Sequence, residues 1–272
     1  MQFARLNDIN VHHQVIGSSA GRPWLVFVNS LGTDFRIWRD VIVRLAGDYG
    51  ILAYDMRGHG LSDVGRTPYS IELLADDLAA LIDHVGARAP IIVCGVSVGG
   101  MVAQSLAVRR PDLAHALILC DTLPKMGDAA SWDARIAAIE SDGIASIADT
   151  IMERWFTPAF RRTSPDFPGY RNMLMRQPMD GYIATCVALR EADLSALLPK
   201  IRVPTLCVVG DRDGAPTPRL VADFAKAIRG AHLEVVPDCG HIPSIEQPER
   251  LVDIVRAFIP IALTEAVSHV SH

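Results

Sequence analysis

The sequence predicts a doubly wound α/β fold, a mostly parallel sheet with helices on both faces, from three observations. Short β-branched apolar runs recur along the chain, helical patterns lie between several of them, and the run Leu206-Cys207-Val208-Val209 is apolar at every position. Alternating strands and helices imply parallel pairing, and strands covered on both faces need apolar residues throughout. A chain of 272 residues that is 50% hydrophobic can bury such a core in one domain with an insertion.

The expected elements can be placed in order along the chain. A two-stranded hairpin comes first, and helical segments separate several of the later strand candidates. In one helix, apolar residues recur every three or four positions between Ile71 and Val85, Ser70 can cap the N-terminus and Gly86 can end it. The strand candidates are residues 2–7, 11–16, 24–28, 50–54, 91–95, 116–120, 204–209 and 232–236.

A long insertion separates two of the predicted strands. About eighty residues lie between Cys120 and Thr205, whereas a parallel crossover needs only about a dozen. The insertion carries helical spacing and no strand signal, as in Ile144, Ile147, Ile151 and Trp155. We therefore expect a helical cap over the carboxyl edge of the sheet, where α/β proteins bind ligands. The predicted division is a core of residues 1–121 and 204–265, a cap of residues 122–203 and a C-terminal tail of residues 266–272.

The composition argues against several kinds of partner. A formal net charge of −5 offers no basic surface for nucleic acid or an anionic membrane. We find no apolar run long enough to cross a bilayer and no secretory signal, so a cytoplasmic protein is expected. The five cysteines are widely spaced, which favours small buried side chains over a metal or redox site. No metal or cofactor is expected.

The most informative stretch is Gly95-Val96-Ser97-Val98-Gly99, between an apolar run and a helical pattern. A serine on so sharp a strand-to-helix turn needs neighbours without bulky side chains, and the two glycines provide the space. The amide of Val98 would then stand at a helix N-terminus, where it can meet a developing oxyanion. The bare pattern also occurs as an ordinary glycine-rich connection, but its position between strand and helix favours a nucleophile elbow with Ser97 as nucleophile.

A serine nucleophile needs a base and a group that orients the base. His241 is the best-placed histidine, since it follows the last predicted strand, and the chain order of this elbow requires a late histidine. For the acid we favour Asp213, which lies far enough past its strand to reach a loop histidine. The alternatives are Asp121, which ends the preceding strand, and Asp211, which better suits a turn.

Two loops can support such a site. The loop of residues 29–34 follows the third strand, and the amide of Leu31 there is a candidate second oxyanion donor. A tight turn without a ligand role is the alternative for this loop. His59 lies between Gly58 and Gly60 and before the elbow, so we expect it to hold backbone and not to take part in the chemistry.

Taken together, these residues resemble the serine α/β-hydrolases, and most closely the 3-oxoadipate enol-lactone hydrolases of aromatic catabolism. The likeness covers most of the chain, and the cap segments make it specific, since the elbow belongs to the whole superfamily. The chain departs from that pattern at Val96, Val98 and Gly214, and at Asp121, where that family tends to carry Asn. The matching segments are residues 28–34, 54–60, 131–136, 153–158 and 188–194.

The resemblance implies an eight-stranded α/β-hydrolase fold with the cap between strands six and seven. It also implies hydrolysis of a small carboxylated enol-lactone to a keto diacid, in the β-ketoadipate pathway of protocatechuate and catechol breakdown. Because the whole chain is acidic, a local cation should hold the substrate carboxylate, and Arg135 and Arg190 in the cap are candidates. Trp132 is a candidate pocket residue; surface exposure of the arginines and packing within the cap are the alternatives.

Two other functions stay open. One is a carboxylesterase or a lactonase that acts on a neutral substrate with the same residues. The other is a receptor of the same fold that binds a small molecule without turnover. In each case the expected partner is a small molecule, and the sequence does not predict an oligomeric state.

Overall fold

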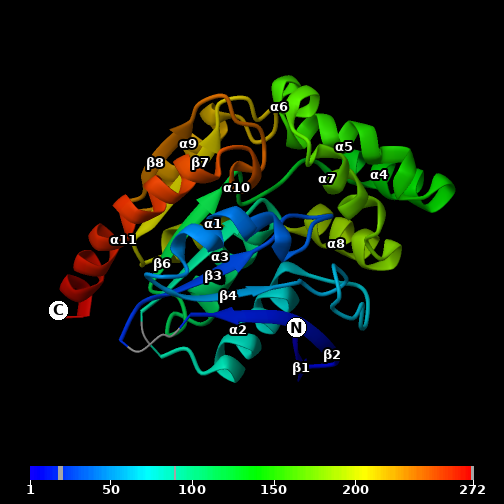
Figure 1. Ribbon diagram of the computed structural model, residues 1–272. Helices are drawn as coiled ribbons and strands as arrows, with labels where there is room; N and C mark the ends of the chain where they lie inside the picture. The colour runs from blue at the N-terminus through cyan, green and yellow to red at the C-terminus, as the bar shows by residue number, and fades with distance from the viewer. Residues whose placement is uncertain (18–20, 89, 271–272) are drawn as a thin grey trace.

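The computed structural model describes residues 1–17, 21–88 and 90–270, and within them eight strands form one sheet (Figure 1). The strand order is β1-β2-β4-β3-β5-β6-β7-β8. Strand β2 pairs antiparallel with β1 and β4, and all other neighbours are parallel. This confirms the predicted fold class. The strands are β1 (Gln2–Leu6), β2 (Ile9–Ile16), β3 (Trp24–Val28), β4 (Gly50–Tyr54), β5 (Ile91–Val96), β6 (Ala116–Cys120), β7 (Thr205–Gly210) and β8 (His232–Val236).

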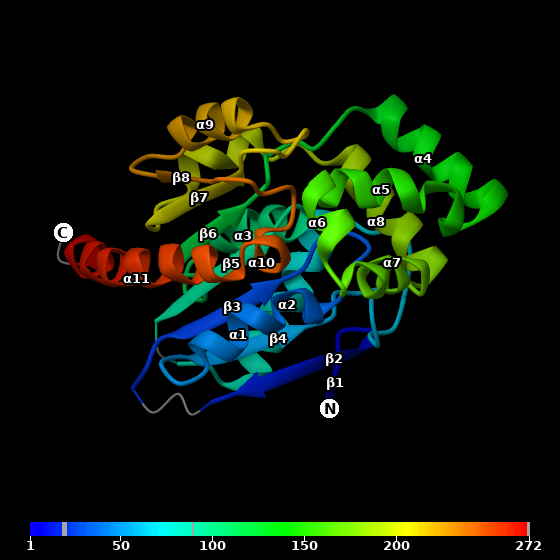
Figure 2. The same cartoon turned by 45° about the horizontal axis from the view of Figure 1, so that its top comes forward.

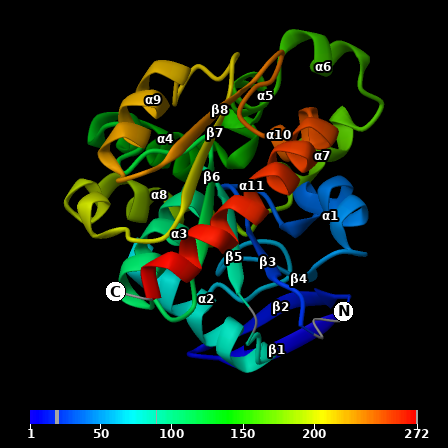
Figure 3. The same cartoon turned by 90° about the vertical axis from the view of Figure 1, so that its left-hand side faces the viewer.

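Helices cover both faces of the sheet, as Figure 3 shows. One face carries α1 (Arg39–Leu45) and α11 (Pro248–Val270), and the other carries α2 (Ile71–Val85), α3 (Val98–Arg109) and α9 (Pro218–Ala227). Helix α2 has the predicted ends: the Ser70 side chain accepts from the Leu73 amide, and Gly86 has φ 72°. The central strands β3, β4, β5, β6 and β7 are buried at every position, as strands between two helical layers must be.

The segment between β6 and β7 forms a helical layer over one end of the sheet (Figure 2). No strand occurs in residues 122–203, all of which the structure describes. The helices there are α4 (Ala129–Asp142), α5 (Ala148–Trp155), α6 (Pro158–Thr163), α7 (Phe167–Met175) and α8 (Met179–Glu191), with the 3₁₀ segments η2 (Ile144–Ile147) and η3 (Ser195–Lys200). Cap and core meet backbone to backbone at Gly181 and Gly58, where a Cβ on Gly181 would collide with the Gly58 carbonyl oxygen.

The C-terminal segment differs from the expectation of a tail. Helix α11 continues to Val270, so most of residues 266–272 extends that helix, and residues 271–272 lie outside the described residues. Apolar residues such as Val255, Phe258 and Ala262 are buried along α11, and this contact explains why the helix forms. Among the described helices, none combines the length and the apolar character needed to cross a membrane. All five cysteines are free and buried.

Candidate active site

The candidate residues lie at the carboxyl edge of the parallel strands, under the cap. Parallel strands deliver the loops that follow them to one edge of the sheet. The loops after β3, β5, β7 and β8 thus bring together Leu31, Ser97, Asp213 and His241, although more than two hundred positions separate the first from the last in the sequence. The short elements η1 (Phe35–Trp38) and α10 (Pro243–Glu246) follow two of these loops.

Ser97 occupies the sharp turn that the sequence predicts. Strand β5 ends at Val96, helix α3 begins at Val98, and Ser97 between them has φ 57° and ψ −120°. A non-glycine residue in this region is strained, and such strain is typical of functional sites. A Cβ on Gly95 would collide with the backbone of Gly99, and one on Gly99 would collide with the Val28 carbonyl oxygen. The turn can form only because Gly95 and Gly99, two positions before and after Ser97, carry no side chains.

His241 and Asp213 form a buried pair. His241 Nδ1 lies 2.6 Å from Asp213 Oδ2, and Asp213 Oδ1 accepts a hydrogen bond from the Ala215 amide at 3.0 Å. Burial alone would raise the pKa of Asp213, but the facing His241 and the hydrogen bonds to the carboxylate outweigh burial and lower it. Asp213 is therefore an anion that can hold the imidazole in one orientation and stabilise its charged form.

The two alternative acids have other partners. Asp211 Oδ1 accepts from the Cys239 amide at 3.2 Å, so Asp211 links two loops, in keeping with the turn role that its position suggests. Asp121 Oδ1 accepts from the Gly210 amide at 2.9 Å, and His241 Nδ1 bonds to Asp213 rather than to Asp121. One ligand atom each of Asp121, Asp213 and His241 lie within 4.8 Å of one another, and within this cluster His241 and Asp213 are hydrogen-bonded directly.

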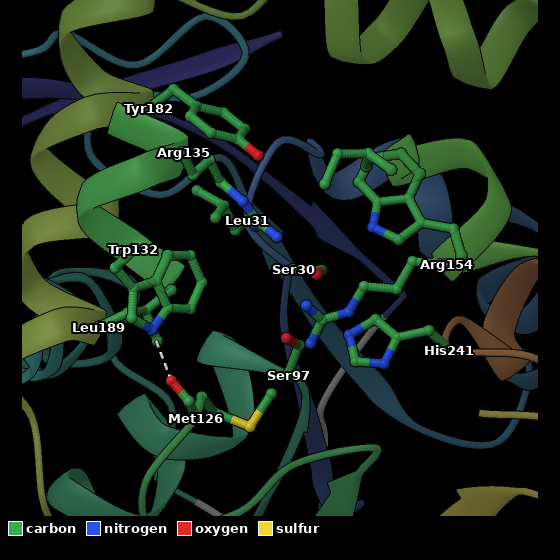
Figure 4. Close-up of a pocket in the computed structure, with 12 residues that line it drawn as sticks. Ser30, Leu31, Ser97, Met126, Trp132, Arg135, Arg154, Tyr182, Leu189 and His241 are labelled. Atoms are coloured by element: carbon green, nitrogen blue, oxygen red, sulfur yellow. Dashed lines mark hydrogen bonds between the residues drawn. The ribbon is translucent and has the colours of Figure 1, made fainter. Parts of the chain in front are cut away.

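Ser97 and His241 line the same narrow cavity, together with side chains from the cap (Figure 4). The Ser97 hydroxyl and the His241 ring both point into it, and side chains of α4, α5 and α8 complete the wall. Its free volume is about 20 Å³, room for a single water molecule. The lining residues are Ser30, Leu31, Ser97, Met126, Trp132, Arg135, Ile151, Arg154, Trp155, Tyr182, Leu189 and His241.

The two candidate oxyanion donors flank Ser97. Leu31 lines the cavity, and Val98 is the first residue of α3. Within the described residues, neither amide donates a hydrogen bond to another protein group, so both are available to a ligand. Two free donors at a helix N-terminus and a neighbouring loop are the arrangement that stabilises an oxyanion.

His59 holds the loop that carries Leu31. Its Nε2 accepts from the Gly32 amide at 3.1 Å, and its Nδ1 lies 3.1 Å from the Arg57 carbonyl oxygen. Burial lowers the pKa of His59 to about 4, so the ring is neutral at pH 7 and can accept from Gly32. His59 therefore supports backbone, as its glycine-rich surroundings suggest.

Of the two arginines predicted to bind a carboxylate, the structure brings only Arg135 to the cavity. The Arg135 guanidinium stands 4.7 Å from the ring centre of Trp132, and the Trp132 indole N–H donates to the Met126 carbonyl at 2.6 Å. Arg190 does not line the cavity: its guanidinium bonds to Asp133 at 2.6 Å and to Glu191 at 2.8 Å. The structure therefore places Arg190 outside the cavity and in ion pairs with acidic neighbours, which is the alternative that the sequence left open for these arginines.

Arg154 is a cavity residue that the sequence prediction missed. It projects from α5 toward Ser97 and His241, and its Nη2 donates to the Ala215 carbonyl at 2.6 Å (Figure 4). Burial and the nearby Arg135 lower the pKa of Arg154, and a guanidinium keeps its charge in proteins. Helical spacing could have revealed it, because Ile151, three positions earlier, and the adjacent Trp155 line the same cavity.

The cap also holds the loop that carries His241. The His241 amide donates to the Trp155 carbonyl at 3.0 Å. Glu246 accepts from the Gly240 amide at 2.9 Å, from the Thr157 amide at 3.1 Å and from the Thr157 hydroxyl. The position of His241 therefore depends on contacts with the segment that follows α5.

Comparison with known proteins identifies the family of this chain. Residues 25–254 match the model of the alpha/beta hydrolase family. The chain is 35% identical to 3-oxoadipate enol-lactonase 2 of Acinetobacter baylyi, over 92% of this chain and 93% of that protein. The crystal structure of the enol-lactonase from Burkholderia xenovorans superposes with a TM-score of 0.90 at 34% identity, over 95% of this chain and all of that one.

A second solved structure shows the range of activities on this scaffold. A thermophilic esterase from Thermogutta terrifontis, with malate bound, has a TM-score of 0.89 at 28% identity and covers 96% of this chain and 99% of its own. These relatives support a hydrolase that acts on an ester or a lactone. The match over most of the sequence and the close superposition show that the chain belongs to the alpha/beta hydrolase family.

Proposed function

We propose that the protein is a serine hydrolase that opens a small carboxylated enol-lactone, converting 3-oxoadipate enol-lactone to 3-oxoadipate in the breakdown of aromatic compounds. One observation carries this proposal: the Ser97 hydroxyl shares a narrow cavity with His241, which Asp213 holds, and with two guanidinium groups. The enol-lactonases among the relatives support the substrate class.

In the first half of the reaction, Ser97 Oγ attacks the lactone carbonyl while His241 Nε2 takes its proton. The tetrahedral oxyanion lies between the amides of Leu31 and Val98. Each such donor contributes about 3 kcal/mol to transition-state stabilisation. When the ring C–O bond breaks, the enolate oxygen receives the proton from His241, and the enol rearranges to the ketone.

In the second half, water attacks the acyl carbon of the Ser97 ester. His241 takes a proton from the water and returns it to Ser97 Oγ as the ester bond breaks. Asp213 stays ionised throughout and stabilises the charged imidazole, in agreement with the direction of its pKa shift. The free enzyme and the keto diacid are the products.

The remote carboxylate of the substrate is assigned to Arg135 and Arg154. Within the described residues, neither guanidinium forms an ion pair with a carboxylate, although both are half-buried. Two cations in one narrow cavity favour an anionic ligand, because the repulsion between them is relieved when the anion binds. Since these side chains fill much of the space, the substrate must displace them as it enters.

An esterase or a lactonase with a neutral substrate is the main alternative, and the Thermogutta terrifontis esterase shows that close structural relatives hydrolyse esters. The cationic cavity favours the carboxylated substrate over a neutral one. A receptor role is less well supported, because a slow or absent reaction would not require Ser97, Asp213 and His241 in this arrangement.

Replacement of the proposed nucleophile or acid is the central test. We expect Ser97→Ala to keep the fold and to lower kcat about a million-fold, and Asp213→Asn to lower it about ten-thousand-fold, as comparable changes do in other serine hydrolases. Hydrolysis of the enol-lactone is followed by absorbance, and circular dichroism checks the fold. Wild-type turnover in a folded Ser97→Ala variant would contradict the proposal.

The carboxylate assignment is tested with a matched set of arginine variants. Arg135→Ala and Arg154→Ala should raise KM for the enol-lactone about tenfold or more while KM for a short neutral aryl ester changes little, since only the former loses a charged hydrogen bond. Arg190→Ala is the control, because Arg190 is a cap arginine outside the cavity. Equal losses on both substrates would contradict carboxylate binding.

A further inference from the structure

Asp121 is a buried carboxyl group that the proposed mechanism does not use. It follows β6, has φ 46° and is fully buried. Its Oδ1 accepts from the Gly210 amide at 2.9 Å, whereas within the described residues no N–H or O–H group of another residue donates to Oδ2. A buried carboxylate oxygen without a donor is costly, so the state of this group needs an explanation.

Asp121 lies next to the acid of the proposed triad. One oxygen each of Asp121 and Asp213, together with a ring nitrogen of His241, lie within 4.8 Å of one another. Two carboxylates so close in a buried site cannot both be ionised, and the one with better partners keeps the charge. Asp213 has His241 and the Ala215 amide, whereas Asp121 has one neutral amide.

We propose that Asp121 is a protonated carboxylic acid whose Oδ2–H donates a hydrogen bond to the Asp213 carboxylate, and that it acts as a positioning residue for the acid of the active site. The protonation rests on geometry alone, and the positioning role rests on the proposed function. The donated bond accounts for Oδ2, because that atom becomes a donor to the only carboxylate within reach in the described cluster.

The groups around the pair are consistent with this arrangement. Cys120, the last residue of β6, precedes Asp121, and Asp213 faces it from the loop after β7. Cys239 and His241 face it from the loop after β8. Arg154 in α5 acts electrostatically on Asp213. Burial, followed by the charge of Asp213, holds the pKa of Asp121 well above its usual range. The guanidinium of Arg154 acts on Asp213, and the neutral thiols of Cys120 and Cys239 act on Asp121.

The bond has a predictable effect on catalysis. A hydrogen bond to Asp213 withdraws negative charge from the oxygen that faces His241. The imidazolium that forms when His241 takes the proton of Ser97 is then less stabilised by Asp213. Loss of this donor should move the acid limb of the kcat/KM profile to higher pH. If Asp121 were ionised in the wild type, its negative charge would already hold the limb at higher pH, and its removal would move the limb down.

The first test compares Asp121→Asn with Asp121→Val. We expect Asp121→Val to lower kcat/KM about tenfold. Asp121→Asn should keep most of the wild-type kcat/KM, because the neutral amide of Asn can donate to Asp213 and can accept from the Gly210 amide. The acid limb should move up in Asp121→Val and stay in place in Asp121→Asn. A downward shift of about one pH unit in Asp121→Asn would show that Asp121 is ionised, and would overturn the proposal.

The second test does not require turnover. The infrared spectrum of the Ser97→Ala protein at neutral pH should contain the C=O stretch of a protonated carboxylic acid, and the same protein with Asp121→Asn should lack it. An unchanged spectrum in this region overturns the proposal even if Asp121→Val fails to fold. If Ser97→Ala keeps full activity, the proposed function fails, and the infrared band still decides the protonation of Asp121.

Discussion

His59 shows how one buried side chain supports the site at the residue scale. Its neutral ring accepts from the Gly32 amide, so the loop that carries Leu31 keeps its shape. A protonated ring could not accept this bond, because both of its nitrogens would be donors. The lowered pKa of His59 is therefore part of how the oxyanion loop is built.

This histidine should make stability depend on pH. The pKa of His59 is about 4 in the fold and about 6.5 in an unfolded chain, so between these values the unfolded state binds the additional proton. The free energy of unfolding should fall as pH drops through that window. Compared with wild type, His59→Gln should be less stable at pH 7, and the difference should shrink by about 3 kcal/mol toward pH 4.

Urea unfolding of both proteins at several pH values between 7 and 4 measures this effect. Glutamine at position 59 can still offer an acceptor toward Gly32 but does not titrate, so it isolates the contribution of the ring. Parallel stability curves for the two proteins would contradict the assignment of a neutral, buried His59.

At the scale of elements, the cap and the loop after β8 are linked by hydrogen bonds that the sequence does not reveal. Glu246 in α10 joins Gly240, next to His241, to Thr157 at the start of α6. Burial raises the pKa of Glu246, although its hydrogen bonds oppose the shift. The cap therefore contributes to the position of the candidate base in addition to lining the cavity.

Glu246→Gln should weaken this link. The amide nitrogen of Gln cannot accept, so either Gly240 or Thr157 loses its acceptor, at a cost of about 1–3 kcal/mol in the free energy of unfolding. We also expect kcat to fall several-fold because His241 is held less firmly. Glu249→Gln is the control, since the Glu249 side chain is 81% exposed and pairs with Arg44 at the surface. Similar losses in both variants would contradict a role for Glu246.

At the scale of the whole molecule, the charge of the cavity opposes the charge of the protein. The chain carries a formal net charge of −5, yet Arg135 and Arg154 point into the cavity. Attraction of an anionic substrate must therefore be local, because charges farther away than about 10 Å are screened in physiological salt. The cap supplies both cations, so it determines which ligands the core residues can act on.

A small dicarboxylate such as adipate should therefore stabilise the folded protein. At one hundred times its Kd, a ligand that binds only the native state adds about 2.7 kcal/mol to the free energy of unfolding. Differential scanning fluorimetry of the Ser97→Ala protein should show a rise in Tm with adipate and a smaller one with the uncharged adipamide. An equal rise with both compounds, or no loss of the adipate effect in Arg135→Ala, would contradict the charge argument.

The sequence determined those features of this protein that depend on local patterns. Apolar runs and helical periods predicted the order of strands and helices, and two glycines around Ser97 predicted the elbow, because only a turn without Cβ atoms at those positions fits there. The position of His241 after the last strand followed from the rule that parallel strands deliver their loops to one edge.

Only the tertiary structure decided which side chains meet. Arg154 and Arg190 lie in similar cap helices, yet one points into the cavity and the other pairs with acidic residues outside it. The choice between Asp213 and Asp121 as partner of His241 likewise depends on loop geometry across three strands. Local sequence specifies a helix or a turn, but the direction in which it faces is set by packing against segments far away in the chain, and this is why these contacts could not be predicted.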